Sequence, residues 1–563
     1  MRKFTYIIVL MLVMPAVASA QVAKQVEVSK DYTPSINSAQ KLSIVPDMTD
    51  TVKIRPDIDY TITPRSYETS LMTQNFKPAT ITYWDFKRSR PFYARAALGA
   101  PLTSEADAYV STFNKDKGYA MAYVNHWGDY RKRPLLYTGE LGDDLRAEMS
   151  NRLGGRAGLF LGPRRLEVDV YGDDQLRHRY PTTGKKIHFG RANAKLRFGD
   201  DFTDLSRWNF NIEVDGGLFY NGREDNKFNE SNFAANVAVG KMVGQHVLRI
   251  HAAYSGIYGS KMLEEYKNNR LMVGARYGIS SNRFEFLLGA DYQHDKVSNA
   301  TDSPHHIFPY LRMTWKNTSE GFVPFVEVDG GLVSHDFGTI LYNNPFLKPS
   351  ASTGAELSKI PNESVYNGRI GFCGSLGKSI FSYSLSAELS LADEHLYWYS
   401  KGADYFFTMA YQHSLRIDGQ MKLRPAAWFE AEANVGVFAW ENYDSYYSNR
   451  PNFDFGLALR YTGRKVTAGV NLGYQGGIKW LTMNDEAQMG YTKTDGTFTL
   501  GIEAEWRINE RWAVFAEGRN LTGSTLYEWL HYYTDSAQGL AGVKFSFLVV
   551  RHTFGTTAFF ALI

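Results

Sequence analysis

The stretch Ala427–Ala439 reads Ala-Trp-Phe-Glu-Ala-Glu-Ala-Asn-Val-Gly-Val-Phe-Ala and alternates apolar with polar side chains. Successive side chains of a β-strand point to opposite faces, so Ala431 and Val435 share one face while Glu430 lies on the other. The same unit recurs from about residue 91 to residue 547, and the connections between its copies are alternately tight and long. Lipid outside and water inside a closed barrel account for such a long series of two-faced strands.

Residues 1–20 have the pattern of an export signal. Arg2 and Lys3 form a basic start, Ile7–Val17 form an apolar core too short to cross a bilayer, and Ala18-Ser19-Ala20 form a small-residue cleavage site. We therefore expect a cleaved signal peptide and a final location in the outer membrane of a Gram-negative cell.

Three further segments follow the signal. Residues 21–91 contain spaced prolines in a polar stretch, which disfavours helix and predicts a short, extended periplasmic leader or reduced plug. Residues 92–547 are expected to form the barrel. Residues 548–563 follow the expected last strand as a C-terminal tail.

Composition narrows the class of protein. The chain has 62 basic and 59 acidic residues, a balance that argues against nucleic acid as a partner. Its one cysteine, Cys373, cannot form an internal disulfide. Aromatic residues make up 15% of the chain, and 36 residues are Tyr, as expected when Tyr and Trp ring both membrane interfaces of a barrel.

The connections predict the topology. Counting the runs between turns gives an all-β, antiparallel transmembrane barrel of about 22 strands, within a range of 18–22, with both ends in the periplasm. The expected tight turns lie at 114–118, 162–164, 244–245, 280–282, 317–321, 377–378, 424–425, 462–464 and 509–510. The expected long connections are 126–149, 173–185, 221–230, 259–268, 294–305, 337–364, 394–405, 441–449, 476–496 and 521–538.

Alternation also assigns charged side chains to the lumen. Pairs of carboxylates on one strand face are a common result of alternation, so they do not indicate acid–base catalysis. His294-Asp295, His305-His306 and His335-Asp336 lack a nucleophile motif or spaced ligand set, and we interpret them as solvated residues in or beside loops. The sequence therefore predicts neither an enzyme nor a metal or cofactor site. The residues assigned to the lumen are Glu167, Asp169, Lys195, Arg197, Glu213, Asp215, Arg249, His251, Glu388, Glu430, Glu432, Glu503, Glu505 and Arg507.

Aromatic residues gather in the long connections of the C-terminal half. Such rings stack on a sugar or another apolar ligand face, or anchor a protein partner. The alternative is an interfacial girdle plus loops that pack on one another. The candidate surface-ligand residues are Tyr397, Trp398, Tyr399, Tyr446, Tyr447, Trp480, Trp529 and Tyr532.

Two motifs resemble a known family. Phe515–Thr522, then Tyr527 and Gly539–Phe547, are similar to the last two strands of TonB-dependent receptor barrels, and Val26–Pro34 resembles a leader of Bacteroidota outer-membrane barrels of this type. The resemblance implies an outer-membrane barrel that serves in transport. A full receptor has a plug domain before its barrel, and 21–90 is shorter than such a plug.

Two functions follow from these observations. The first is a transport or channel barrel of receptor-like architecture that contacts outer-membrane lipid. The second is a scaffold barrel that binds envelope or surface proteins, with Val26, Glu27, Val28 and Tyr32 as the candidate partner-binding residues of the leader. A wide barrel must also be closed, and we expect the leader to do so, with the connections 126–149 and 337–364 or a partner as the alternatives.

Overall fold

The computed structural model describes residues 91–114, 117–131, 147–178, 186–202, 204–222, 227–301, 305–316, 321–348, 353–377, 380–440, 450–534 and 537–547. The expected signal peptide, the expected tail and all of the expected leader except Pro91 lie outside these ranges. No helix among the described residues is long and apolar enough to cross a membrane.

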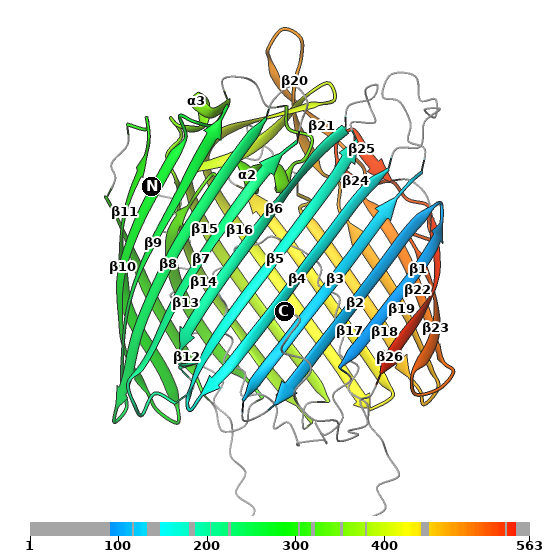
Figure 1. Ribbon diagram of the computed structural model, residues 1–563, viewed down its shortest axis with the longest axis horizontal. Coiled ribbons are helices and arrows are strands. Elements are labelled where there is room, and N and C mark those ends of the chain that lie inside the picture. The colour runs from blue at the N-terminus through cyan, green and yellow to red at the C-terminus, as the bar shows by residue number, and fades with distance from the viewer. Residues whose placement is uncertain are drawn as a thin grey trace, which may run out of the picture. The chain divides into compact units, whose positions relative to one another are not determined.

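Within these ranges, 22 antiparallel strands form a closed barrel (Figure 1). They are β1 (Phe92–Ala100), β2 (Thr103–Asn114), β3 (Gly118–Asp129), β4 (Glu148–Leu161), β5 (Arg164–His178), β6 (Lys186–Gly199), β7 (Asn209–Asn221), β8 (Phe228–Val243), β9 (His246–Lys261), β10 (Lys267–Ser280), β11 (Phe284–Val297), β12 (His305–Trp315), β13 (Val323–Val333), β14 (Glu363–Leu376), β15 (Phe381–Lys401), β16 (Asp404–Ala426), β17 (Phe429–Trp440), β18 (Phe453–Thr462), β19 (Val466–Gln475), β22 (Thr497–Arg507), β23 (Trp512–Arg519) and β26 (Gln538–Phe547).

The first and last strands close the wall. β1 pairs with β26 from Phe92↔Phe547 to Ala100↔Gly539. At the end of the barrel that carries the long connections, the described connections contain short helices and hairpins. They are α2 (Phe337–Asn343), α3 (Thr353–Leu357), β20 (Lys479–Met483) with β21 (Met489–Lys493), and β24 (Leu526–Trp529) with β25 (Tyr532–Thr534).

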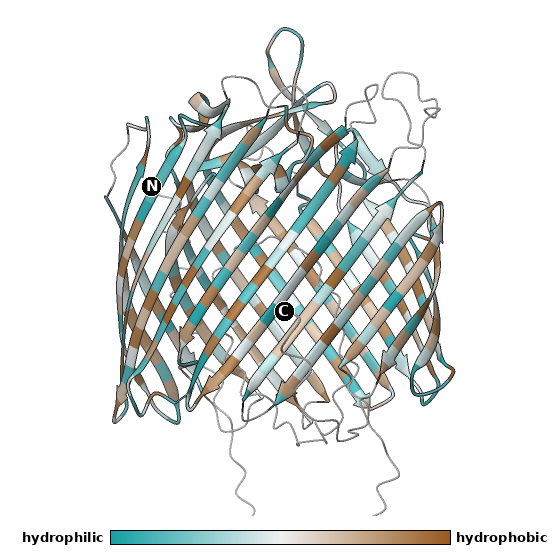
Figure 2. Ribbon diagram, viewed as in Figure 1, coloured by the Kyte–Doolittle hydropathy of each residue, from teal (hydrophilic) through white to brown (hydrophobic). Residues whose placement is uncertain are grey.

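The alternation of faces is confirmed, and Figure 2 shows it as brown and teal bands along the strands. Val168 and Ile250 are about half exposed on the outside. The charged residues between such positions pair across strands on the inside, as Lys195 does with Glu213 at 2.6 Å. Aromatic side chains exposed near the strand ends include Trp208, Trp428, Trp506, Trp512, Tyr220, Tyr258, Tyr292 and Tyr474.

Two of the expected connections are wrong. The ladder of β15 and β16 continues past the expected loop 394–405 to Lys401↔Asp404, so a two-residue turn joins these strands. The expected turn at 424–425 is a register shift between Leu423 and Ala426, and β16 ends only at Ala426. Proline cannot donate a ladder hydrogen bond, and a bulge accommodates Pro425 within the strand.

Candidate functional site: the extracellular lid and an adjacent cavity

Helix α2 forms in the connection between β13 and β14. Asp336 caps its N-terminus by accepting a hydrogen bond from the Thr339 N–H at 2.8 Å, and the Asn344 N–H donates to the Ile340 carbonyl at 2.9 Å. Phe337, Ile340 and Leu341 of the helix are buried. Phe337, Ile340 and Leu341 are spaced three and four residues apart directly after the capping Asp336. This pattern predicts a helix, which the interpretation of the sequence as strands and loops missed.

Helix α2 packs on the inside of the wall formed by β5 to β8. The Phe337 ring lies 4.8 Å from that of Phe228 on β8. Tyr342 meets Phe189 of β6 edge to face at 5.0 Å, and its hydroxyl donates to Asp173 of β5. The guanidinium of Arg191, also on β6, lies 4.3 Å above the Tyr342 ring. Aromatic contacts and a charged hydrogen bond therefore fix the helix to this part of the wall.

The chain then reaches the opposite part of the rim. Leu347 forms an isolated bridge with Tyr405 near the start of β16, and Lys348 pairs with Asp404 at 2.6 Å. Phe346 stacks on Tyr532 of β25 with ring centroids 3.4 Å apart. Strands β6 and β16 are ten positions apart in a ring of 22, so they stand almost opposite each other. The segment 337–348 therefore crosses the mouth of the barrel at the end that carries the long connections, which is the end that the sequence predicts to be extracellular.

The return path covers another part of the mouth. Helix α3 lies against the connection between β9 and β10, where Leu263 and Leu357 are both buried. Gly354 permits this contact, since a Cβ there would lie 2.3 Å from the Met262 carbonyl oxygen. The Asn299 N–H donates to the Ser358 carbonyl at 2.8 Å.

A core of aromatic rings joins four extracellular elements. Trp529 lies 5.7 Å from Trp398 of β15, 6.0 Å from Trp480 of β20 and 5.1 Å from Tyr405 of β16. The Tyr405 hydroxyl accepts from the Leu530 N–H at 2.8 Å, and the Tyr532 hydroxyl donates to the Ala403 carbonyl at 3.1 Å. We call 334–348, 353–362, the β15–β16 tip and the hairpins β20–β21 and β24–β25 the extracellular lid.

The candidate surface-ligand aromatics lie largely inside this core. Tyr397, Trp398, Trp480, Trp529 and Tyr532 are at most 9% exposed, as the packing alternative expects. Tyr399 is half-buried and stacks on Phe406 at 5.5 Å, so it retains some accessible surface. Tyr446 and Tyr447, and the leader residues Val26, Glu27, Val28 and Tyr32, lie outside the described residues. A ligand at these aromatic residues stays a prediction.

Buried polar groups lie at the base of the lid. The Phe337 N–H donates to Glu230 of β8 at 2.9 Å. Burial raises the pKa of Asp336 and lowers the pKa of His335, whose Nε2 lies 3.2 Å from the Glu394 carbonyl oxygen. The interpretation of His335 as a solvated loop residue is wrong, because the loop folds inward and leaves the side chain 7% exposed.

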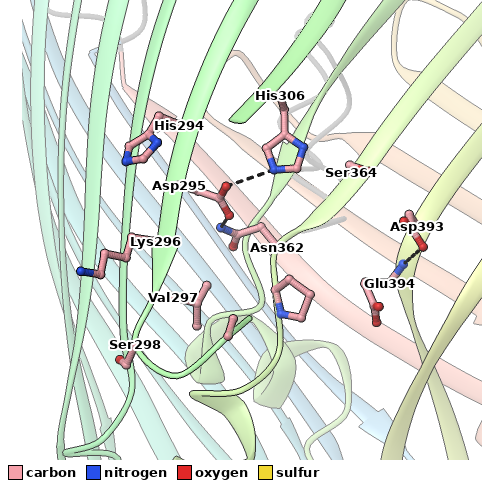
Figure 3. A pocket seen from close by; sticks show the side chains of 12 residues that line it. His294, Asp295, Lys296, Val297, Ser298, His306, Asn362, Ser364, Asp393 and Glu394 are labelled. Atoms are coloured by element: carbon pink, nitrogen blue, oxygen red, sulfur yellow. Dashed lines mark hydrogen bonds and ion pairs between the residues drawn. The ribbon is translucent and has the colours of Figure 1, made fainter. Parts of the chain in front are cut away.

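A polar cavity of about 740 Å³ lies beside the lid (Figure 3). Asn362 donates to Asp295 Oδ2 at 2.6 Å, and His306 Nε2 lies 3.2 Å from Asp295 Oδ1. Asp295 is 6% exposed, so its interpretation as solvated is also wrong. The described residues contain no group of three or more His, Cys, Asp or Glu that could hold a metal ion. The lining is His294–Ser298, Ala300, His306, Pro361, Asn362, Ser364, Asp393 and Glu394.

A bulge in β15 shapes one side of this cavity. The pairing with β16 shifts register between Ala392 and His395, and Glu394 takes the left-handed backbone conformation, with φ of 59°. Bulges re-aim side chains next to functional sites. Here the bulge places both Asp393 and Glu394 in the cavity lining.

Comparison with known proteins supports the fold class. No protein-family model and no curated protein matches the sequence. Among solved structures, the chain is similar to the FrpB iron transporter from Neisseria meningitidis, with 12% identity, a TM-score of 0.62 and coverage of 81% of both chains. The copper transporter OprC gives 11% identity, a TM-score of 0.61 and coverage of 81% of this chain and 80% of that one.

The ferripyoverdine receptor of the Pseudomonas aeruginosa outer membrane is also similar. The identity is 11%, the TM-score is 0.60, and 81% of this chain and 71% of that chain are covered. These identities establish a shared fold alone. The chain shares the closed β-barrel fold of these outer-membrane receptors and transporters, which is the fold that the resemblance to TonB-dependent receptors implies.

Proposed function

We propose that this protein is a gated outer-membrane transport barrel whose extracellular lid opens to admit a solute. The observation that carries the proposal is the segment 337–348, which is attached to β5–β8 at one end and to β16 and β25 at the other. A barrel of 22 strands has a lumen wide enough to need closing, and a lid built from loops is suited to opening on demand.

The attachment at Leu347 provides a direct test. In a Cys373→Ser background, Leu347→Cys with Tyr405→Cys places two thiols at paired positions, where a disulfide can form without large movement. We expect ion conductance in planar bilayers to be low in the oxidised protein and to rise when the disulfide is reduced.

A second variant opens the lid without a disulfide. Phe346→Ala removes the stack on Tyr532, and we expect more frequent openings than in the parent protein. Phe284→Ala, at an exposed ring on the outside of β11, is the matched control and should conduct like the parent. Equal conductance of the oxidised and reduced cysteine pair would contradict lid gating. A stoichiometric protein partner on a barrel that never conducts would favour the scaffold.

A further inference from the structure

The barrel wall is split between β12 and β13. Pairing between these strands is limited to the four pairs from Leu311↔Val328 to Thr314↔Phe325. In contrast, β12 pairs with β11 as far as His305↔His294, and β13 pairs with β14 as far as Val333↔Glu363. The extracellular halves of β12 and β13 therefore separate, although each strand stays in the sheet on its other side.

The sequence explains where the split begins. If the register continued, Pro309 would lie opposite Gly330, and proline has no N–H for the ladder. Gly330 permits a close approach that a side chain would block. A Cβ there would lie 2.6 Å from the Val365 carbonyl oxygen and 2.7 Å from Cδ1 of Phe308.

Beyond the split, the end of β13 lies on the lumen side of β12. The Leu332 N–H donates to Gln293 Oε1 of β11 at 3.3 Å, and Arg270 of β10 donates to the Leu332 carbonyl. Gln293 and Arg270 alternate with the outward residues Tyr292 and Leu271, so both reach Leu332 from the lumen. Side chains thus satisfy backbone groups that a β12 partner would otherwise take.

One aromatic ring closes the split. Phe308 of β12 is fully buried, and its ring lies 4.9 Å from that of Tyr366 on β14. The polar cavity adjoins this contact, because its lining includes His306 and Ser364. His306 is two residues before Phe308 in β12, and Ser364 is two residues before Tyr366 in β14. Ile307, which lies between His306 and Phe308 in β12, is 68% exposed on the outside. The split therefore lies in the membrane-facing part of the wall.

We propose that this split is a lateral portal, closed by Phe308, through which a molecule with an apolar chain passes between the outer leaflet and the polar cavity. A molecule that enters through the membrane-facing wall needs an apolar chain to reach it. The lining carries three carboxylates, on Asp295, Asp393 and Glu394, and one lysine, Lys296. This excess of negative charge favours a cationic head group over an anionic one.

The portal can be tested with fluorescent labels on one strand. In a Cys373→Ser background, Glu394→Cys carries a small fluorophore at the cavity, Leu385→Cys carries it on the lipid side of β15, and Ser390→Cys carries it on the lumen side. In vesicles of phospholipid brominated near the head group, we expect quenching at position 394 to lie between that at 385 and that at 390. Phe308→Ala should at least double the quenching at 394 and leave that at 390 unchanged.

The controls keep the outcome decisive. If Phe308→Ala does not insert, Tyr366→Ala removes the other half of the contact from the outer face. Quenching at 394 that equals that at 390 in every background would overturn the portal. This readout is quenching by lipid, whereas lid gating is read as ion conductance, so failure of the portal and failure of the gating proposal are distinguishable.

The head group is tested with two spin-labelled probes of equal chain length, an alkylamine and a fatty acid. Asp295 and Asp393 remain in the lining of the Glu394→Cys protein, so we expect the amine to quench the label at 394 more strongly than the fatty acid does. Equal or reversed quenching would overturn the assignment of a cationic head group.

Discussion

Neighbouring residues of one strand lie in different solvents. Val470 of β19 is 37% exposed on the lipid side, whereas Asn471 points into the lumen, where its Cβ lies close to Gly501. Because the period of a strand is two, this difference repeats along each strand of the wall. The same charge therefore has a very different effect at adjacent positions.

We expect Val470→Arg to impair insertion and Asn471→Arg to be tolerated. A cation at the lipid face costs about 2–4 kcal/mol near the bilayer midplane, while the lumen is wet. Refolding yield in lipid vesicles, read from heat-modifiable migration on gels, compares the two variants. Equal yields would mean that the two faces are assigned the wrong way round.

Asp336 makes the lid sensitive to pH. Its pKa is raised by burial, with Glu230 and His335 as ionisable neighbours, so the closed lid binds this proton more tightly than the open one. Protonated Asp336 therefore stabilises the closed lid relative to the open one. This stabilisation is complete below the ordinary aspartate pKa of about 3.9 and is lost as pH rises through the raised pKa. Burial lowers the pKa of His335, so the closed lid disfavours its protonated form, and His335 destabilises the closed lid as pH falls.

Asp336→Asn should therefore slow amide hydrogen exchange in α2 relative to the parent at about pH 8, with the difference vanishing near pH 4. Asparagine keeps the acceptor that caps the Thr339 N–H, so the helix retains its N-terminus. Parent and variant are compared at the same pH because intrinsic exchange rates change with pH. A difference that is constant with pH would contradict the role of the Asp336 proton.

At the scale of elements, a network of ion pairs spans the closing seam. Arg95 of β1 contacts Glu105 of β2 at 2.7 Å and Glu517 of β23 at 2.9 Å, and Arg519 also pairs with both carboxylates. Strand β26 lies between β23 and β1, so Arg95 bridges across it. The network connects both sides of the last strand inside the lumen.

Arg95→Met should lower the free energy of unfolding by about 2 kcal/mol, because the largely buried Arg95 donates to two carboxylates, and hydrogen bonds to charged groups contribute about 1.5–3 kcal/mol. Urea unfolding in detergent measures the change. Arg424→Met, which removes a 3.9 Å pair at an exposed site, is the control and should have little effect. An equal loss of unfolding free energy in both variants would mean that the network at the seam stabilises the barrel no more than an exposed ion pair does.

The hairpin β20–β21 is an addition to the barrel. Strands β19 and β22 pair directly from Val466↔Trp506 to Gln475↔Thr497, without help from the hairpin. Replacing 477–495 by an Asn-Gly turn should therefore leave the refolding yield unchanged. It should also raise conductance, because Trp480 and its lid contacts are removed. Loss of folding would show that the hairpin supports the wall.

The strand pattern could be predicted from the sequence because alternation and turn residues are local signals. The strand count, the lumen faces of Glu167 and Lys195, and most turns follow from them. At Gly330 the packing is close, since Phe308 fills the space beside it. Its consequence, a split wall, needs Pro309 on another strand and could not be inferred from either residue alone.

The lid could not be predicted in the same way. Its core joins residues far apart in the chain, such as Phe346 and Tyr532, which meet only after the barrel has closed. The clustering of aromatic residues in the loops was visible in the sequence. Whether such rings face a ligand or one another depends on tertiary packing, which has no local sequence signal.

At the scale of the whole molecule, closure at the two ends is separable. The lid covers the extracellular mouth, whereas the expected closure by the leader 21–91 lies outside the described residues and stays a prediction. Deleting 22–76 while keeping the signal peptide should raise conductance further in the reduced Leu347→Cys/Tyr405→Cys protein. If conductance stays at the value of the undeleted protein, the leader does not narrow the pore.

The segment 337–348 also has a mechanical consequence. A wide cylinder held only by its hydrogen-bonded wall deforms easily into an ellipse, but a strut across its diameter resists that deformation. The anchors at Asp173 and Tyr405 make this segment such a strut at the extracellular rim. Sideways pressure from the membrane is therefore resisted more strongly at that rim than where short turns join neighbouring strands.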